Sequence, residues 1–178
     1  MTTGLFTTLV ISHIMNSEKT DSSSTWVIWK WCTALHQMTW VWNMVITIFF
    51  WAVLFPFDDG NYRSTLTHVL TYMDHICPFS YVTIDWAMSA MRYEKTTFWI
   101  NIVAALVYGI VNVLFTWITG HAVYPPVLTW DSIVAWIIGL ALIPFFGLIF
   151  YLEFWATNWK LSKINTTTEV KADEEPLI

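Results

Sequence analysis

The chain alternates long apolar runs with short polar segments. Four runs are long enough to cross about 30 Å of hydrocarbon as a helix, and they cover residues 34–56, 65–91, 98–119 and 132–157. Each run is expected to be helical, because a loop or an open strand would leave backbone groups unpaired in lipid. The pattern therefore predicts an all-α fold, a polytopic transmembrane helical bundle with about four spans.

The segments outside these runs are more polar. Residues 1–33 form an N-terminal polar or amphipathic segment, with a short apolar run at 4–15 and a polar linker at 16–25. The short run has the length of a surface helix or a weak signal-like segment, and no basic residues precede it. The acidic segment 161–178 is predicted to be a disordered tail. The transmembrane domain is thus expected at 34–160.

Composition agrees with a membrane location. Of the 178 residues, 56% are hydrophobic, 18% are aromatic and only 12% are charged, which is too apolar for an ordinary soluble domain. The net charge of −5 comes without any basic stripe, so nucleic acid is not an expected partner. Cys32 and Cys77 are too few and too widely spaced for a disulfide framework or a zinc site. Neither a metal nor a cofactor is expected.

The basic residues predict an orientation. With four crossings, every Lys and Arg except Arg63 falls on one side of the membrane, and the positive-inside rule makes this side cytosolic. Both termini, and with them the acidic tail, are then cytosolic. The sequence predicts an integral protein of an endomembrane, either the endoplasmic reticulum or an endolysosomal membrane, or of the plasma membrane.

Two short motifs in the tail require opposite locations. Asn165-Thr166-Thr167 is a glycosylation sequon, which needs the lumen. The C-terminal sequence DEEPLI matches an acidic dileucine sorting pattern, which is read from the cytosol. A cytosolic tail favours the second motif.

The second apolar run carries polar residues on one face. His68, Thr71 and His75 have the i, i+3, i+7 spacing of a helical stripe. If the helix enters the membrane at Thr65, His75 lies about 15 Å deep, near the middle. Pro78 removes a backbone donor and is expected to kink the helix beside His75. The stripe predicts a polar pocket inside the bundle.

Two roles are open for His75. A neutral imidazole can serve as a general base and activate a nearby hydroxyl. Alternatively, His75 hydrogen-bonds a polar side chain of a neighbouring helix, and Asn43, Asn101 and Asn112 are available for this. Asp85 lies ten residues further, about 15 Å along the helix axis, so it lines the pocket without touching His75.

Other polar positions carry structural expectations. Glu153, near the end of the last run, is expected to snorkel or to pair with Lys160. The chain contains no GxSxG, HExxH, P-loop or dinucleotide fingerprint. Soluble enzyme families are therefore not supported.

The order of these features resembles the androgen-induced protein and rolling stone families of membrane proteins. The resemblance covers residues 34–160 and rests on FFWAVLFPFDD, on the His75-x9-Asp85 spacing, and on GHAVYPPVLTW, in which Val123-Tyr124-Pro125 precedes Trp130-Asp131. It implies a six-helix protein. Androgen-induced members cleave fatty acid esters of hydroxy fatty acids with an intramembrane Thr and His, whereas rolling stone members are linked to cell fusion and muscle formation.

The resemblance assigns site residues in two ways. The family histidine matches His75, and in one register the four runs correspond to the last four family helices, so the helix that bears the family threonine has no counterpart. In a second register, Trp29-Lys30-Trp31-Cys32-Thr33 matches the W-K-x-x-T start of that helix. Thr33 would then be the nucleophile.

Two functions follow as hypotheses. The first is a lipid-ester hydrolase with His75 as the base and Thr33 as the nucleophile. The second is a non-enzymatic scaffold or an adhesion component in which His75 is structural. The expected partners are membrane lipids, a lipid-ester substrate, and either a second copy of the chain or a protein that supplies further helices.

Overall fold

The computed structural model describes residues 22–57, 64–125 and 127–174, and all of their long elements are helices. In chain order, the elements are α2 (Ser22–Phe49), a π-helical turn η1 (Phe50–Leu54), a 3-10 turn η2 (Phe55–Phe57), α3 (Thr65–Met88), α4 (Thr97–Thr119) and α5 (Ile133–Glu174). The described residues contain no strand. The predicted all-α fold with four long helices is confirmed.

Three helical stretches in the described part of the chain are long and apolar enough to cross a membrane. They are Trp29–Phe57, Thr97–Thr119 and Ile133–Ile164, and they match the first, third and fourth predicted spans. The second predicted span forms α3, which is helical but does not meet the same test, because His68, Asp74, His75 and Asp85 lower its hydropathy. The molecule is thus compatible with an integral membrane protein.

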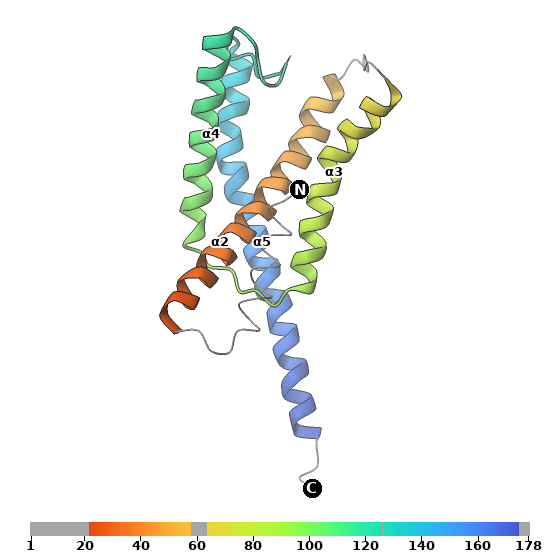
Figure 1. The fold of residues 1–178 in the computed structure, drawn as a ribbon, viewed down its shortest axis with the longest axis vertical. Helices are drawn as coiled ribbons and strands as arrows, with labels where there is room; N and C mark the ends of the chain where they lie inside the picture. The colour runs from red at the N-terminus through yellow and green to blue at the C-terminus, as the bar shows by residue number, and fades with distance from the viewer. Residues whose placement is uncertain (1–21, 58–63, 126, 175–178) are drawn as a thin grey trace.

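The helices are arranged around α2 (Figure 1). α2 packs against α3 on one side and against α4 and α5 on the other, and α4 also packs against α5. The core lies where α2 meets α5 and consists of Val41, Val45, Phe146, Ile149 and Phe150. α3 is therefore fastened to the bundle mainly through α2.

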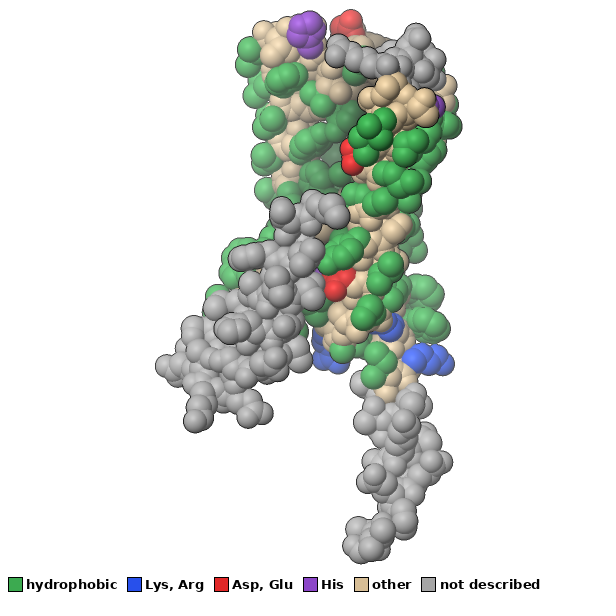
Figure 2. All heavy atoms as spheres, turned by 45° about the vertical axis from the view of Figure 1, so that its right-hand side comes forward, with side chains coloured by type: hydrophobic (Ala, Val, Ile, Leu, Met, Phe, Trp, Pro, Cys, Tyr) green, Lys and Arg blue, Asp and Glu red, His purple; other side chains and the backbone are tan. Residues whose placement is uncertain are grey.

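Most of the remaining apolar residues face outward. Leu66 of α3, Trp117 of α4 and Leu140 of α5 are each more than 60% exposed, and apolar side chains are spread along the described helices on the face drawn in Figure 2. An apolar exterior of this extent suits lipid and not water.

The helix ends follow from local chemistry. Ser64 caps α3, where its side chain accepts a hydrogen bond from the Thr67 amide at 3.2 Å. α4 ends at Gly120, which has φ of 70°, the left-handed conformation that glycine adopts most readily. Each cap fixes the point where the chain leaves a helix, and so sets the lengths of the connections.

Two predicted boundaries differ from the structure. α2 begins at Ser22, inside the segment predicted to be polar or amphipathic, and α5 runs to Glu174, through most of the segment 161–178 that was predicted to be disordered. Residues 161–174 contain no Pro or Gly to stop the helix, which explains its continuation. The run 4–15, Arg63, most of DEEPLI and the side chains of the Asn165 sequon lie outside the described residues.

The described basic side chains gather at one end of the bundle. They belong to the start of α2, the α3–α4 connection and the part of α5 beyond the bundle core (Figure 2). Lys30 pairs with Glu94 at 3.7 Å, and Lys95 lies 5.3 Å from the centre of the Phe154 ring. The charge asymmetry read from the sequence is thus present in three dimensions. The assignment of this end to the cytosol stays a prediction.

Candidate functional site

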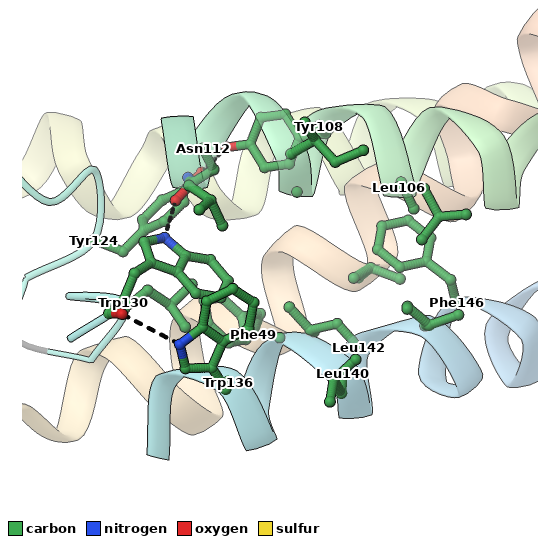
Figure 3. Close-up of a pocket in the computed structure, with 18 of the residues that line it drawn as sticks. Phe49, Leu106, Tyr108, Asn112, Tyr124, Trp130, Trp136, Leu140, Leu142 and Phe146 are labelled. Carbon is green, nitrogen blue, oxygen red and sulfur yellow. Dashed lines mark hydrogen bonds between the residues drawn. The ribbon is translucent and has the colours of Figure 1, made fainter. Parts of the chain in front are cut away.

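A large apolar cavity lies between α2, α4, α5 and the connection from 120 to 132. Its volume is about 590 Å³, and it is partly open to the surroundings. The walls include Val45 and Phe49 of α2, Gly109 of α4, and Leu142 and Phe146 of α5 (Figure 3). A volume of roughly 300 to 1,000 Å³ is typical of sites for small molecules.

The α4–α5 connection folds inward and closes one end of the cavity. Trp130 is 7% exposed, and its indole N–H donates to Asn112 Oδ1 at 2.6 Å. The indole N–H of Trp136 donates to the Trp130 carbonyl at 3.2 Å. Trp130 has φ of 61°, an uncommon conformation for a large side chain, and these two hydrogen bonds hold it there.

A glycine makes room for this arrangement. A Cβ on Gly139 would lie 2.8 Å from Trp130 Cη2, closer than real atoms approach. Gly109, on the facing wall, is different, because a Cβ there would meet nothing within 4 Å. One glycine of the cavity is needed for packing, and the other borders open space.

The hydroxyl and amide groups that line the cavity lie at its closed end. Tyr108 and Tyr124 hydrogen-bond through their hydroxyls, next to Asn112 (Figure 3). Burial raises the pKa of the Tyr124 hydroxyl well above its usual range, and the hydrogen bond with Tyr108 acts in the same direction. Tyr124 is therefore neutral at physiological pH.

A second feature, a buried polar cluster, occupies the end of the bundle near the α3–α4 connection. His36 of α2 is 4% exposed and binds two partners: its Nε2 lies 2.6 Å from Asp85 Oδ2, and its Nδ1 lies 2.5 Å from the Tyr93 hydroxyl. These bonds join α2, α3 and the α3–α4 connection.

The positions of the protons in the Tyr93–His36–Asp85 triad follow from the chemistry of Tyr93 and Asp85. Burial raises the pKa of the Tyr93 hydroxyl far above its usual range, and the Glu153 and Asp85 carboxylates add to the effect. Tyr93 therefore stays protonated at physiological pH. Because the Asp85 carboxylate can only accept, the proton of a neutral His36 ring lies on Nε2 and is donated to Asp85, and Nδ1 accepts from the Tyr93 hydroxyl. Both ring nitrogens of His36 are occupied.

The cluster continues into α4 and α5. Gln37 is fully buried, and its Oε1 accepts a hydrogen bond from the Thr97 hydroxyl at 2.5 Å. Its side chain also interacts with the Glu153 carboxyl, although the geometry falls short of a hydrogen bond. Glu153 is 1% exposed, and neither of its carboxyl oxygens has a hydrogen-bond partner among the described residues.

Lys160 corrects one expectation from the sequence. Glu153 was expected to snorkel or to pair with Lys160, but it is buried. The Lys160 ammonium instead donates to the carbonyls of Trp86 and Ser89, the latter at 2.7 Å, and lies 4.5 Å above the Trp86 ring. Lys160 satisfies the end of α3, where helix carbonyls lack partners.

His75 lies apart from this cluster. Its ring stacks on Phe50 with 3.7 Å between centroids, and its carbonyl accepts a hydrogen bond from the Thr47 hydroxyl at 2.7 Å. Pro78 lies inside α3, which continues past it, and because it cannot donate a backbone hydrogen bond the carbonyl of Asp74, four residues earlier, lacks its usual helical donor. His75 Nδ1 is buried without a partner in the described part of the molecule.

Thr33 lies at another level of the bundle. His75 touches Thr47, and fourteen residues separate Thr33 from Thr47 on α2, about 21 Å along the axis. The structure therefore does not bring Thr33 and His75 together. Thr33 instead lies one turn before His36 and beside a small hollow of about 40 Å³, and its buried hydroxyl has no partner among the described residues.

The predicted pocket-lining residues separate in the same way. Asp85 joins the His36 cluster, and Asn112 joins the apolar cavity. His68 bonds the Tyr72 hydroxyl within α3, whereas the side chains of Thr71 and Asn43 donate to carbonyls one turn earlier in their own helices. These five residues do not form one pocket.

Sequence reasoning did not single out His36, Gln37 or Tyr93. His36 and Gln37 lie inside the first apolar run, where polar residues are as unusual as His75 is in the second, and that signal was available. Tyr93 lies in a short connection, and nothing in its local sequence indicates burial. In the described part of the chain, no three His, Cys, Asp or Glu side chains form a group that could hold a metal ion.

Comparison of the chain with protein-family models, with curated proteins and with solved structures finds no match. The site is therefore interpreted from its own geometry.

Proposed function

We propose that this protein is a non-enzymatic integral membrane protein that binds the hydrocarbon part of a lipid in the cavity between α2, α4 and α5. One observation carries the proposal: a cavity of about 590 Å³ with almost entirely apolar walls lies between three helices that are apolar enough to span a membrane. Hydrocarbon chains surround such helices in a bilayer, and the cavity is partly open to them. Apolar walls favour an apolar occupant by excluding water from both surfaces.

The test fills the cavity from its open wall. Gly109→Phe adds a ring where a Cβ meets no atom within 4 Å, so it should occupy the site without disturbing the fold. Val107→Phe is the matched control, because Val107 lies on α4, is 55% exposed and does not line the cavity. Saturable labelling by a diazirine-bearing alkyl lipid in phosphatidylcholine nanodiscs is expected for the wild type and for Val107→Phe, and is lost in Gly109→Phe.

Equal saturable labelling of all three proteins would overturn the proposal. Mapping the labelled peptides adds a second criterion, since label should be found on the cavity-lining parts of α4 and α5. Thermal unfolding of each variant shows whether a lost signal reflects a filled cavity or a damaged fold.

A lipid-ester hydrolase is the second candidate, and one observation favours it. The unpartnered hydroxyl of Thr33 lies one helical turn before His36, whose ring binds Asp85. A histidine held by a carboxylate beside a hydroxyl has the parts of an acid–base site. Two observations weigh against it: Tyr93 occupies the other ring nitrogen, and the adjoining hollow of about 40 Å³ is too small for a lipid ester.

Turnover of long-chain esters by the purified protein distinguishes the candidates. The hydrolase requires activity that Thr33→Ala and His36→Gln each abolish at matched thermal stability. Activity that His75→Ala and Thr33→Ala abolish, but His36→Gln does not, would return the reaction to the pair expected from the sequence. Absence of turnover in the wild type overturns the hydrolase, and the labelling experiment then decides lipid binding.

A further inference from the structure

The cavity has two chemically different ends. The far end, around Leu142 and Phe146, is lined by aliphatic and aromatic side chains, among them Trp42, whereas the end closed by the α4–α5 connection holds Tyr108, Tyr124 and Asn112 (Figure 3). A site with a long apolar part and a few polar atoms at one end fits an amphipathic molecule in one orientation.

The polar end retains unused hydrogen-bonding capacity. When two phenols hydrogen-bond to each other, only one of the two protons is used, so the Tyr108–Tyr124 pair can still donate once and accept further bonds. Asn112 Oδ1 accepts from Trp130, but the Asn112 amide nitrogen makes no hydrogen bond within the described residues. The polar end thus offers donors and acceptors to a ligand oxygen.

No charged or titratable Lys, Arg, His, Asp or Glu side chain lines the described cavity. Asn112 lies seven residues from the end of α4 at Thr119, about 10 Å along the axis. A carboxylate or phosphate placed there would lose its hydration without gaining an opposite charge, and that loss is costly in an apolar medium. A hydroxyl or an ester carbonyl would keep its hydrogen bonds at much lower cost.

We propose, on the basis of the lipid-binding function above, that the cavity selects uncharged single-chain amphiphiles with an oxygen headgroup, such as long-chain alcohols or monoacylglycerols. The headgroup lies against Tyr108, Tyr124 and Asn112, and the chain extends towards Leu142 and Phe146. The specificity has two sources: hydrogen bonds favour the oxygen, and the absence of cationic side chains disfavours an anion.

The test compares ligands that share one chain. The probe is hexadecanol bearing a diazirine in its chain, with the protein in phosphatidylcholine nanodiscs. Hexadecanol, hexadecane and palmitate compete for labelling at about pH 9, where the carboxyl group of palmitate in a bilayer is ionised. Hexadecanol is expected to compete better than hexadecane by roughly three- to tenfold, the effect of one or two hydrogen bonds, and palmitate is expected to be the weakest competitor.

Variants locate the headgroup. The double substitution Tyr108→Phe and Tyr124→Phe removes both hydroxyls, so the preference for hexadecanol over hexadecane should disappear while the affinity for hexadecane is kept. The single variant Tyr108→Phe retains one hydroxyl and tests the same point if the double variant is unstable. It should reduce the preference by about threefold.

The outcomes separate the two proposals. Labelling that is lost in Gly109→Phe but shows no preference for the alcohol overturns the headgroup inference and leaves lipid binding intact. Better competition by palmitate than by hexadecanol also overturns it. Labelling that Gly109→Phe does not reduce overturns the lipid-binding function itself.

Discussion

The two ends of this bundle differ in how they use polar and apolar residues. At the end near the α3–α4 connection, polar side chains from all four helices fill the interior, and His36 joins Asp85 to Tyr93. At the other end, the interior is apolar and hollow, with about 590 Å³ of space between α2, α4 and α5. Buried hydrogen bonds join the helices at one end, whereas the other end encloses open space.

The two ends also differ in whether they have room for a ligand. Polar and ionisable residues inside a membrane protein are ordinarily the first place to look for a site. Here, the His36 triad is internally satisfied and closed, whereas the apolar end has room for a ligand. We therefore interpret the polar cluster as a structural contact that holds the helices together, and the apolar cavity as the ligand-binding site.

The largest expected change in the free energy of unfolding comes from removing the His36 hydrogen bonds. His36→Ala leaves Asp85 and Tyr93 without their shared partner in a buried setting, and it is expected to lower the free energy of unfolding by about 3 kcal/mol. Titration with SDS in mixed micelles measures this. His75→Ala is the matched control and should lose about 1 kcal/mol, since its ring makes one stacking contact with Phe50.

An equal loss in both histidine variants would contradict the difference between the two sites. A larger loss of unfolding free energy for His75→Ala would show that the contact near Phe50 stabilises the α2–α3 pair more than the His36 hydrogen bonds do.

The next largest change in stability is expected from a substitution at the closed end of the cavity. Gly139→Ala places a Cβ 2.8 Å from the Trp130 ring, so it is expected to lower the free energy of unfolding by about 2 kcal/mol through overpacking. Gly109→Ala meets nothing within 4 Å and should raise it by about 0.5 kcal/mol through helix propensity. The same titration compares them, and a shift of Trp fluorescence is expected only for Gly139→Ala.

If Gly139→Ala is as stable as Gly109→Ala, the Trp130 ring does not pack against Gly139 and does not close that end of the cavity.

The smallest effect concerns Glu153. The Glu153 side chain is 1% exposed, and its carboxyl group has no hydrogen-bond partner in the described part of the chain. The carboxyl group therefore contributes little to the stability of the fold. Glu153→Gln keeps the size and supplies an amide that can pair with Gln37, and it is expected to raise the free energy of unfolding by about 1 kcal/mol. Glu153→Leu, of similar size but without polar atoms, is the control.

Marked destabilisation by Glu153→Gln but not by Glu153→Asp would show that the carboxylate itself is required in the cluster.

The apolar runs allowed the helices to be predicted, because each run has the length and hydropathy that a helix in lipid needs. Composition predicts a disordered tail at 161–178, whereas α5 continues to Glu174 because residues 161–174 contain no Pro or Gly to stop it. Local pattern therefore gives helix identity better than it gives helix ends.

The sites were harder to predict because they depend on how the helices lie against one another. The stripe of His68, Thr71 and His75 is real on α3, but Phe50 meets His75, and the polar partner of Asp85 proves to be His36, 49 residues earlier. The cavity depends on Trp130 folding inward from a connection. No periodicity within one segment carries that information.

Native mass spectrometry of the purified wild-type protein, Gly109→Phe and Val107→Phe tests the lipid-binding site most directly. The wild type and Val107→Phe are each expected to retain one lipid-sized mass and Gly109→Phe to retain none, although all three unfold at similar temperatures. The same bound mass on all three proteins would contradict this expectation.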